Sequence, residues 1–233
     1  MSSIPRALLL LVPTFALIAA DDAAPAPAPA VAPAAKPVVV DGSTLNNLDL
    51  RLTIGGGGGI TKVRDEDLDT DADFEDGHGG NVAVHLLYLR ARSGGVGFAV
   101  GGGVFAHSHT GKPDAGVNRP ESTVNAAGVD VYGAFVLRPT RNWHFELPAV
   151  VVSGGRAKVK TDGAEDSDAG AYGQFALQVG AYYTFDFGLQ LGVDLGGSGF
   201  YARVDQDVGA GTTHEFTFGG GGGYLNLNAG FRF

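Results

Sequence analysis

Leu48-Asp49-Leu50-Arg51-Leu52-Thr53-Ile54 alternates apolar and polar side chains at every position. Successive side chains of a β-strand point to opposite faces, so this period of two predicts a strand with one apolar face. The same alternation returns in seven later segments, and none of their apolar faces carries an ionised side chain. These segments are 82–88, 96–104, 129–137, 143–151, 175–185, 189–195 and 225–233.

The faces opposite the apolar ones hold small residues, glycine and a few charges. A wall that is apolar outside and small or polar inside suits a closed barrel in lipid, because an open sheet edge would leave backbone groups unsatisfied there. We therefore predict an all-β, up-and-down antiparallel transmembrane β-barrel of eight strands. A soluble exported β-barrel with the opposite facing is the alternative.

The charges on the inward faces suggest how the lumen is filled. Eight strands enclose a space only wide enough for side chains. The charges are therefore expected to form a buried ion-pair network that plugs the barrel, rather than to line a conducting channel. The residues of this network are Asp49, Arg51, Asp130, Glu146, Asp194 and Arg232.

Short and long connections alternate between the segments. The short ones follow the second, fourth and sixth segments, and the long polar ones span roughly 61–80, 107–124, 157–169 and 204–214. Outer-membrane barrels show this asymmetry, with tight turns on the periplasmic side. An even number of strands then places both termini in the periplasm. Aromatic side chains at the turn-side strand ends are expected to form a girdle: Tyr88, Trp143, Phe145, Tyr183, Phe185, Phe231 and Phe233.

The N-terminus is typical of an export signal. Arg6 precedes the largely apolar run 7–20, which is shorter than the roughly 20 residues that span a bilayer, and Asp21 follows a plausible cleavage point. Residues 21–47 are rich in alanine and proline, which favours an extended spacer. The predicted organisation is a signal peptide over 1–20, a periplasmic tether over 21–47 and a barrel over 48–233.

The composition excludes several classes of protein. The formal net charge is −9, which argues against nucleic-acid binding, because that requires clustered lysine and arginine. The chain has no cysteine, which excludes disulfides and thiolate metal sites. Its 38 glycines favour strands and turns over helices.

Two polyglycine runs, Gly55–Gly59 and Gly219–Gly223, stand near the two ends of the predicted barrel. They lack the G-x-x-x-x-G-K-[ST] order of a phosphate-binding loop. Glycine in a strand permits tight curvature or close approach of a neighbour. Because the first and last strands must pair to close a barrel, these runs are expected to meet at the seam.

The first long connection is unusually acidic. If it is extended, its alternate carboxylates share one face, and hard cations prefer such oxygen ligands. The hypothesis is a weak Ca²⁺ or Mg²⁺ site with no other cofactor, and the alternative is a solvated acidic loop. The proposed ligands are Asp65, Asp67, Asp69, Asp71, Asp73 and Glu75.

The second long connection contains His107-Ser108-His109 and Glu121, the residue types of a hydrolytic triad. In an extended segment Ser108 points away from both histidines. Lipid A deacylases of the outer membrane carry a His-x-Ser pair, and here His109 stands in the position of that serine. We therefore expect no enzyme.

The ending Leu225-Asn226-Leu227-Asn228-Ala229-Gly230-Phe231-Arg232-Phe233 is similar to the C-terminal signal read by the barrel-assembly machinery. Together with the layout of 48–233, it resembles the small eight-stranded outer-membrane barrels of the outer membrane protein A and outer membrane protein X type. The resemblance implies a bacterial outer-membrane location and contact with outer-membrane lipid and lipopolysaccharide. It also implies recognition of Phe233 by the assembly machinery, and a monomer is expected.

For function, a structural or surface-interaction role with external loops and a plugged lumen is expected. The alternatives are a narrow porin-like channel and a lipid A-modifying enzyme.

Overall fold

The computed structural model describes residues 44–113, 121–161, 168–209 and 211–233, which form one all-β unit. The predicted signal peptide lies outside these residues, as does the tether up to residue 43. The strands are β1 Thr44–Asp65, β2 Thr70–Arg92, β3 Gly95–Pro113, β4 Ser122–Arg138, β5 Trp143–Thr161, β6 Gly170–Thr184, β7 Leu189–Asp207 and β8 Thr213–Arg232. Among the described residues, no helix is long and apolar enough to cross a membrane.

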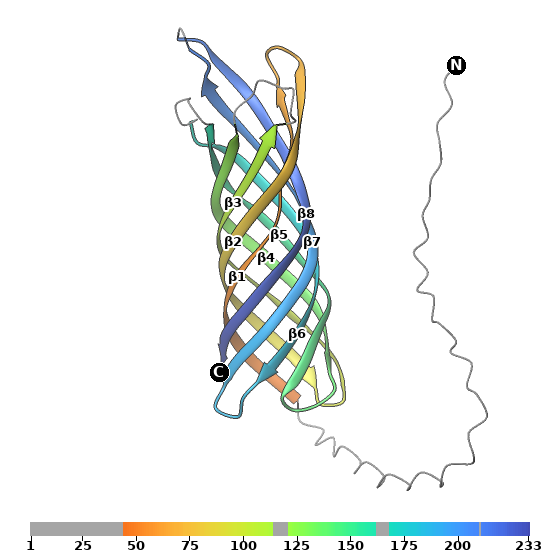
Figure 1. The fold of residues 1–233 in the computed structure, drawn as a ribbon. Helices are drawn as coiled ribbons and strands as arrows, with labels where there is room; N and C mark the ends of the chain where they lie inside the picture. Colours follow the sequence, from red (N-terminus) through yellow and green to blue (C-terminus); the bar gives the residue numbers. More distant parts are fainter. Residues whose placement is uncertain (1–43, 114–120, 162–167, 210) are drawn as a thin grey trace, which may run out of the picture. The chain divides into compact units, whose positions relative to one another are not determined.

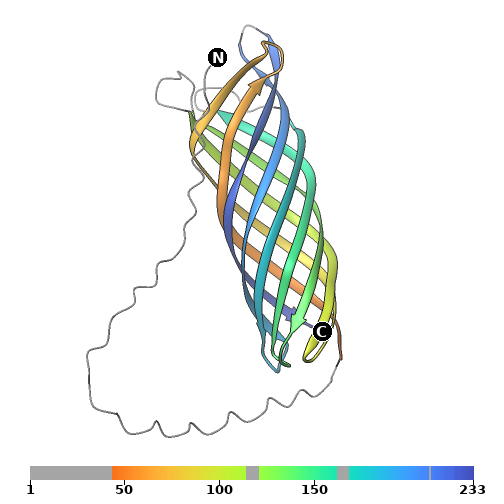
Figure 2. The ribbon, with the colours of Figure 1, turned by 90° about the vertical axis from the view of Figure 1, so that its right-hand side faces the viewer.

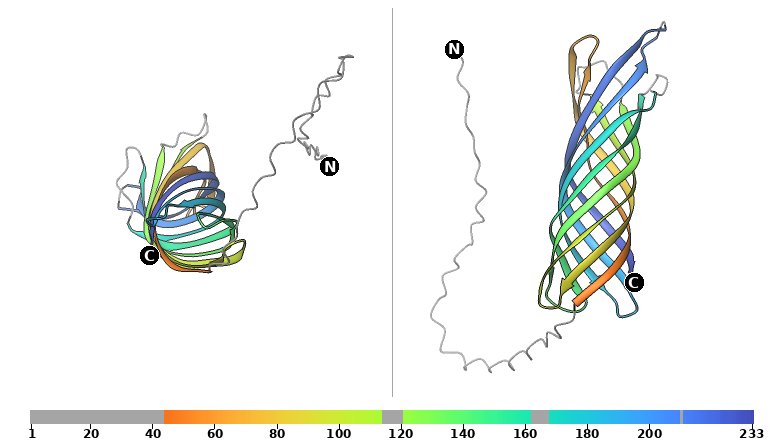
Figure 3. Two further views of the ribbon diagram at one scale, coloured as in Figure 1. Left: turned by 90° about the horizontal axis from the view of Figure 1, so that it is seen from below. Right: turned by 180° about the vertical axis from the view of Figure 1, so that it is seen from behind.

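The eight strands close into a barrel (Figure 1). Each strand pairs antiparallel with the next, and β8 pairs antiparallel with β1, so the up-and-down topology has no free edge. Figures 2 and 3 show the strands tilted around a continuous wall. The last residue belongs to the seam, because the Phe233 amide donates to the Leu48 carbonyl at 2.9 Å. The predicted fold class and strand number are confirmed.

A band of exposed apolar side chains surrounds the lower part of the wall. Leu50 of β1, Phe135 of β4 and Leu227 of β8 are 44%, 70% and 63% exposed, as expected for an outward apolar face. On β5 the band runs from Trp143 to Val152. The nine steps between these two residues, at about 3.3 Å each and tilted by about 40°, give a height of about 23 Å, close to the roughly 25 Å of an outer-membrane barrel.

A β-bulge in β5 changes which of its alternate residues point outward. The pairing of β5 with β6 shifts between Glu146 and Ala149, and both Leu147 and Pro148 are exposed. The extra residue moves the rest of the strand to the opposite parity. The predicted outward position of Val151 is therefore wrong: Val150 and Val152 follow the outward parity, and Val151 packs against a buried apolar cluster.

The strands continue far beyond the apolar band. The connections expected at 61–80 and 204–214 are largely strand, and only Glu66–Asp69 separates β1 from β2. Figure 1 shows the β1–β2 and β7–β8 hairpins rising above the rest of the barrel. These segments looked like loops because their outward positions are polar, yet their alternation continues.

In this upper extension the facing of the wall is inverted. Outward positions such as Lys158 and Arg203 are charged, whereas Val124, Val159 and Phe218 are buried inside. The change follows from the surroundings, because a wall in water must turn its apolar side inward. The barrel thus has a lower part whose lumen holds the buried charges beside a small apolar cluster, and an upper part with an apolar core.

The polyglycine runs meet at the seam, as expected. Gly59 of β1 lies opposite Gly221 of β8, and Gly57 lies opposite Tyr224. A Cβ atom on Gly58 would lie 2.1 Å from the Gly221 carbonyl oxygen, so a side chain there would collide with the neighbouring strand. Glycine is required at this position because the two backbones approach so closely.

Candidate functional site: the lumen and the upper hairpins

An ion pair crosses the middle of the lumen. Arg51 of β1 donates from Nη2 to Glu146 Oε1 of β5 at 2.8 Å and from Nη1 to Oε2 at 3.1 Å. The two side chains are only 1% and 0% exposed. The bidentate geometry satisfies both carboxylate oxygens, which a buried charge pair requires.

Two tyrosines enclose this pair. The Arg51 guanidinium carbon lies 4.1 Å from the centroid of the Tyr182 ring and 5.6 Å from that of Tyr132. Arg51 Nη1 also donates to the Tyr182 hydroxyl at 2.9 Å, and the Tyr132 hydroxyl donates to Glu146. The cation is thus held by aromatic faces as well as by the carboxylate.

A second ion pair lies nearer the short turns. Arg232 of β8 donates from Nε and Nη2 to the two oxygens of Asp49 at 2.8 and 3.0 Å. Gln190 of β7 donates to Asp49 Oδ2 at 3.1 Å. Asp49 and Arg232 are register partners on β1 and β8, so this pair also ties the seam.

The remaining two lumen carboxylates have other partners. Asp130 lies 3.0 Å from His85 Nε2, and Asp194 accepts from Asn228 at 2.8 Å and from Gln178 at 3.1 Å. The structure thus brings all six predicted residues into the lumen. The two arginine ion pairs are linked by His144, whose Nδ1 lies 3.5 Å from Arg232 Nη2 and whose Nε2 lies 3.4 Å from Glu146 Oε1. Asp194 joins the same network through the Tyr182 hydroxyl, which binds Arg51 as well, whereas Asp130 is bound by His85.

Sequence reasoning did not assign roles to the neutral partners. They occupy inward positions of their strands, as the charged residues do, and the period-two alternation therefore indicates that they face the lumen. Nothing in the strand pattern says which of them meet across the lumen. These residues are Thr53, His85, Tyr132, His144, Gln178, Tyr182, Gln190 and Asn228.

A cavity of about 70 Å³ lies in the lumen. Glycines, among them Gly57, Gly58 and Gly79, form part of its lining. Among the polar groups lining it, His85 Nδ1 and Asn226 Oδ1 have no hydrogen-bond partner within the part of the chain that the structure describes. Such a volume and lining suit a few bound water molecules.

Aromatic side chains also contact this part of the lumen. His109 of β3 stacks on Phe200 of β7 with ring centroids 3.9 Å apart, and its Nε2 lies 2.9 Å from the Tyr172 hydroxyl. Phe105 and Tyr172 belong to the apolar core of the upper part of the barrel. The lumen is therefore occupied by ion pairs and a smaller apolar cluster around Leu87, Leu89 and Val136 in its lower part, and by the larger apolar cluster in its upper part.

The triad-like residues do not form a nucleophile–base pair. His109 is buried inside the barrel and His107 contacts the inward-facing Tyr172, while Ser108 holds the intervening, outward parity of β3. Glu121 lies 3.8 Å from Lys112 in an exposed ion pair.

The six carboxylates of the acidic stretch do not share one face. Asp65 is buried at the end of β1, Asp67 and Asp69 lie in the turn, and Asp71, Asp73 and Glu75 are exposed along β2. The segment is the tip of a hairpin rather than an extended loop, and this separates the side chains. Asp71 forms an exposed ion pair with Lys62 at 2.9 Å.

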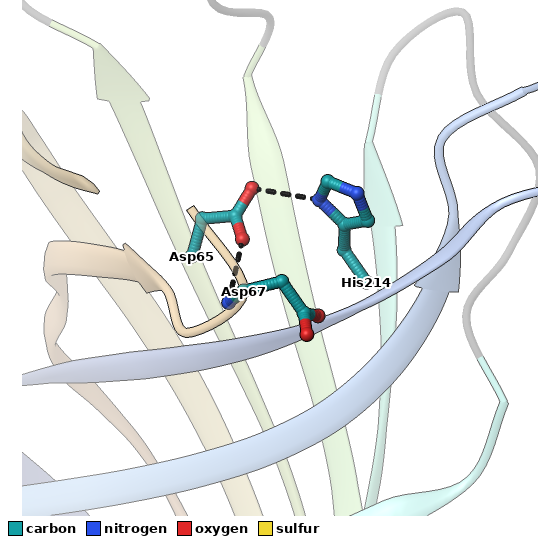
Figure 4. Close-up of side chains that lie close together, drawn as sticks. All are labelled: Asp65, Asp67 and His214. Atoms are coloured by element: carbon teal, nitrogen blue, oxygen red, sulfur yellow. Dashed lines mark hydrogen bonds and ion pairs between the residues drawn. The ribbon is translucent and has the colours of Figure 1, made fainter. Parts of the chain in front are cut away.

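The acidic tip contacts the last hairpin. Figure 4 shows His214 of β8 directed at Asp65, with Nδ1 and Oδ2 3.0 Å apart. Asp67 lies beside them, and ligand atoms of the three residues lie within 4.8 Å of one another. Asp67 also accepts a hydrogen bond from the Glu215 amide at 2.8 Å. Of the proposed ligands, only Asp65 and Asp67 are gathered in this group.

The pKa of the Asp65 carboxyl lies below its ordinary value of 3.8. Burial alone would raise this pKa, but the hydrogen bond from His214 and those from the Leu68 and Asp67 amides stabilise the ionised form more strongly. The contact between the two hairpins therefore depends on a charged Asp65.

No protein-family model matches the chain, and no curated protein matches it. Structural similarity is found to the attachment invasion locus protein Ail of Yersinia pestis, crystallised with the heparin analogue sucrose octasulfate, at 12% identity and a TM-score of 0.37. That match covers 81% of this chain and 100% of Ail.

Two further structures are similar in the same way. The outer membrane protease OmpT of Escherichia coli has 9% identity and a TM-score of 0.44 over 80% of this chain and 97% of its own. OprG of Pseudomonas aeruginosa has 9% identity and a TM-score of 0.36 over 83% and 99%. At these identities and scores no function is transferred, and the assignment of the fold rests on the chain's own strand pairing.

Proposed function

We propose that this chain is a non-enzymatic outer-membrane protein with a structural or surface-interaction role. It has the fold of the small eight-stranded outer-membrane barrels. The observation that carries this proposal is the continuous band of exposed apolar side chains around the wall. A soluble barrel would leave that band in water, whereas a bilayer covers it. The alternative of a soluble barrel with inverted facing fits only the upper part.

The lumen supports a closed rather than a conducting barrel. The Arg51–Glu146 pair spans it at mid-height, and Arg232–Asp49 lies below. Ions would have to break bonds of 2.8 Å between buried charges in order to pass. The tall hairpins would then provide the contacts with external partners. The N-terminal signal would direct export of the chain, and Phe233 would be recognised during assembly of the barrel.

The second candidate is a narrow channel, which the cavity of about 70 Å³ favours. Planar-bilayer recording on the refolded chain separates the two. A plugged barrel should add no conductance above that of the bilayer at neutral pH. Reproducible single-channel steps from the wild-type protein would contradict the plugged form and support the channel.

Weak binding of Ca²⁺ or Mg²⁺ by the acidic tip remains part of the proposal, with Asp65 and Asp67 as the best-placed ligands. Extracellular modules of this kind bind calcium at about 10⁻⁴–10⁻³ M. Hydrogen exchange of the amides at 64–70, measured at increasing calcium concentrations, would test this binding. Exchange in the wild type should slow as calcium is added, and the variant Asp67→Asn should lose this effect. An identical response in both proteins would indicate a solvated acidic tip.

A further inference from the structure

Three cations follow one another on the outer face of β5, and we call Arg156, Lys158 and Lys160 the β5 basic strip. All three side chains are exposed, and they alternate with the inward-facing Ala157 and Val159. The strip begins two positions beyond Gly154, which follows Val152, the last apolar outward residue of this strand. It therefore starts where the apolar band ends.

The cross-strand register partners of the strip are uncharged. Arg156 lies opposite Ala127 of β4 and Ala171 of β6. On β4, Lys158 and Lys160 lie opposite Asn125 and Thr123. None of the three cations has an ion pair or hydrogen bond within the described ranges.

The other exposed cations of the upper barrel differ from the strip, because each of them is paired with a carboxylate. Lys62 binds Asp71, Arg64 binds Glu66 and Asp69, and Arg203 binds Glu215. These cations lie on β1 and β7, on the side of the barrel that carries the acidic hairpins. Among the described residues, β5 thus presents three unpaired positive charges on its outer face, although the whole chain has a net charge of −9.

We propose that the β5 basic strip binds the phosphate groups of the phosphorylated glycolipid that forms the outer leaflet around the barrel. The inference rests on the proposed outer-membrane function and names the residues that contact the lipid. Its support is position and charge: the cations stand directly above the apolar band, where the headgroups of the surrounding lipid lie, and within the described residues none of them is paired with a carboxylate. Juxtamembrane cations attract anionic headgroups in this way.

The test uses the refolded full chain in detergent micelles and lipid A as the probe, measured by native mass spectrometry. Wild-type protein should prefer bisphosphorylated lipid A over its dephosphorylated form. R156Q/K158Q/K160Q should lose affinity for the bisphosphorylated form by at least about tenfold. The matched control K62Q/R64Q/R203Q makes the same change in charge at cations that are already paired, and its affinity should stay within about twofold of wild type.

Folding is verified by heat-modifiable migration on gels, and R156K, which keeps the charge, should bind like wild type. Equal binding of phosphorylated and dephosphorylated lipid A would overturn the proposal, as would an equal loss in the control variant. Competition by millimolar inorganic phosphate would assign the strip to a soluble anion instead of the lipid. Each of these results leaves the proposed barrel function intact, because that function fails only if the folded protein stays out of membranes or conducts.

Discussion

Glu146 binds Arg51 through both of its carboxylate oxygens inside the lumen. Replacing Glu146 with Gln leaves the guanidinium buried without its counter-ion, which costs about 3–5 kcal/mol in comparable buried pairs. We expect the urea midpoint of the refolded protein in micelles to fall accordingly. The double variant R51M/E146L should be closer to wild type, since it removes both charges.

The matched control is Asp71→Asn, which breaks the exposed ion pair with Lys62 and should leave the midpoint almost unchanged. An E146Q protein as stable as the wild type would show that the buried pair contributes nothing to the stability of the barrel.

Asp65 makes the contact between the upper hairpins dependent on pH. Its pKa is lowered below 3.8, so its ionised form stabilises the folded hairpins at pH values above 3.8, and that contribution is lost as the pH falls further. The protection factors of the amides at 64–68 and 213–216, which correct for the intrinsic pH dependence of exchange, should therefore fall in wild type below about pH 4. In Asp65→Asn these protection factors should already be low at neutral pH and should change little with acid. Parallel pH curves for the two proteins would refute this role.

At the residue scale the sequence predicted which side chains face the lumen but not which ones meet. Asp49 and Arg51 have the same parity on β1, yet Asp49 binds Arg232 on the adjacent strand and Arg51 binds Glu146 across the barrel. The partners depend on the stagger between strands, which period-two alternation does not contain.

The seam between β1 and β8 depends on glycine. Gly58→Val would place a branched side chain against the Gly221 backbone, where even a Cβ would lie at 2.1 Å. We expect a loss of about 3 kcal/mol or more and poor recovery of the heat-modifiable folded form. The control is Gly133→Ala on β4, where a Cβ would meet nothing within 4 Å. That variant should be neutral or more stable by about 0.5 kcal/mol. Equal effects of the two substitutions would contradict the close approach at the seam.

At the element scale, period-two alternation predicts the existence, number and order of the strands. It does not predict the residues at which the strands begin and end. Segments with polar outward positions, such as Lys62 to Asp65 and Arg203 to Asp207, looked like loops. In the structure the charged side chains of Lys62, Arg64, Arg203 and Asp205 point outward, and Val63 and Val204 turn inward. The bulge at Leu147 and Pro148 likewise changes parity within one strand. Alternation remains visible in both cases, but its sign is set by the surroundings.

The whole molecule has two unlike ends, and this leads to the last prediction. One end carries both the start of β1 and Phe233, with turns as short as Ser93–Gly94 between β2 and β3. The other end carries the β1–β2 and β7–β8 hairpins, which extend well past the apolar band (Figure 1). If export leaves both termini in the periplasm, the hairpins must face the outside of the cell.

An epitope inserted between Asp67 and Leu68 should therefore bind antibody on intact cells, because exposed hairpin tips tolerate insertions. The same epitope between Ser93 and Gly94 should be detected only after the outer membrane is permeabilised. Both proteins must first show heat-modifiable migration, so that an unfolded chain is not scored. Detection of the Ser93–Gly94 epitope on intact cells, with the hairpin epitope hidden, would reverse the orientation. The β5 basic strip would then face the periplasmic leaflet, and its proposed glycolipid partner would be wrong as well.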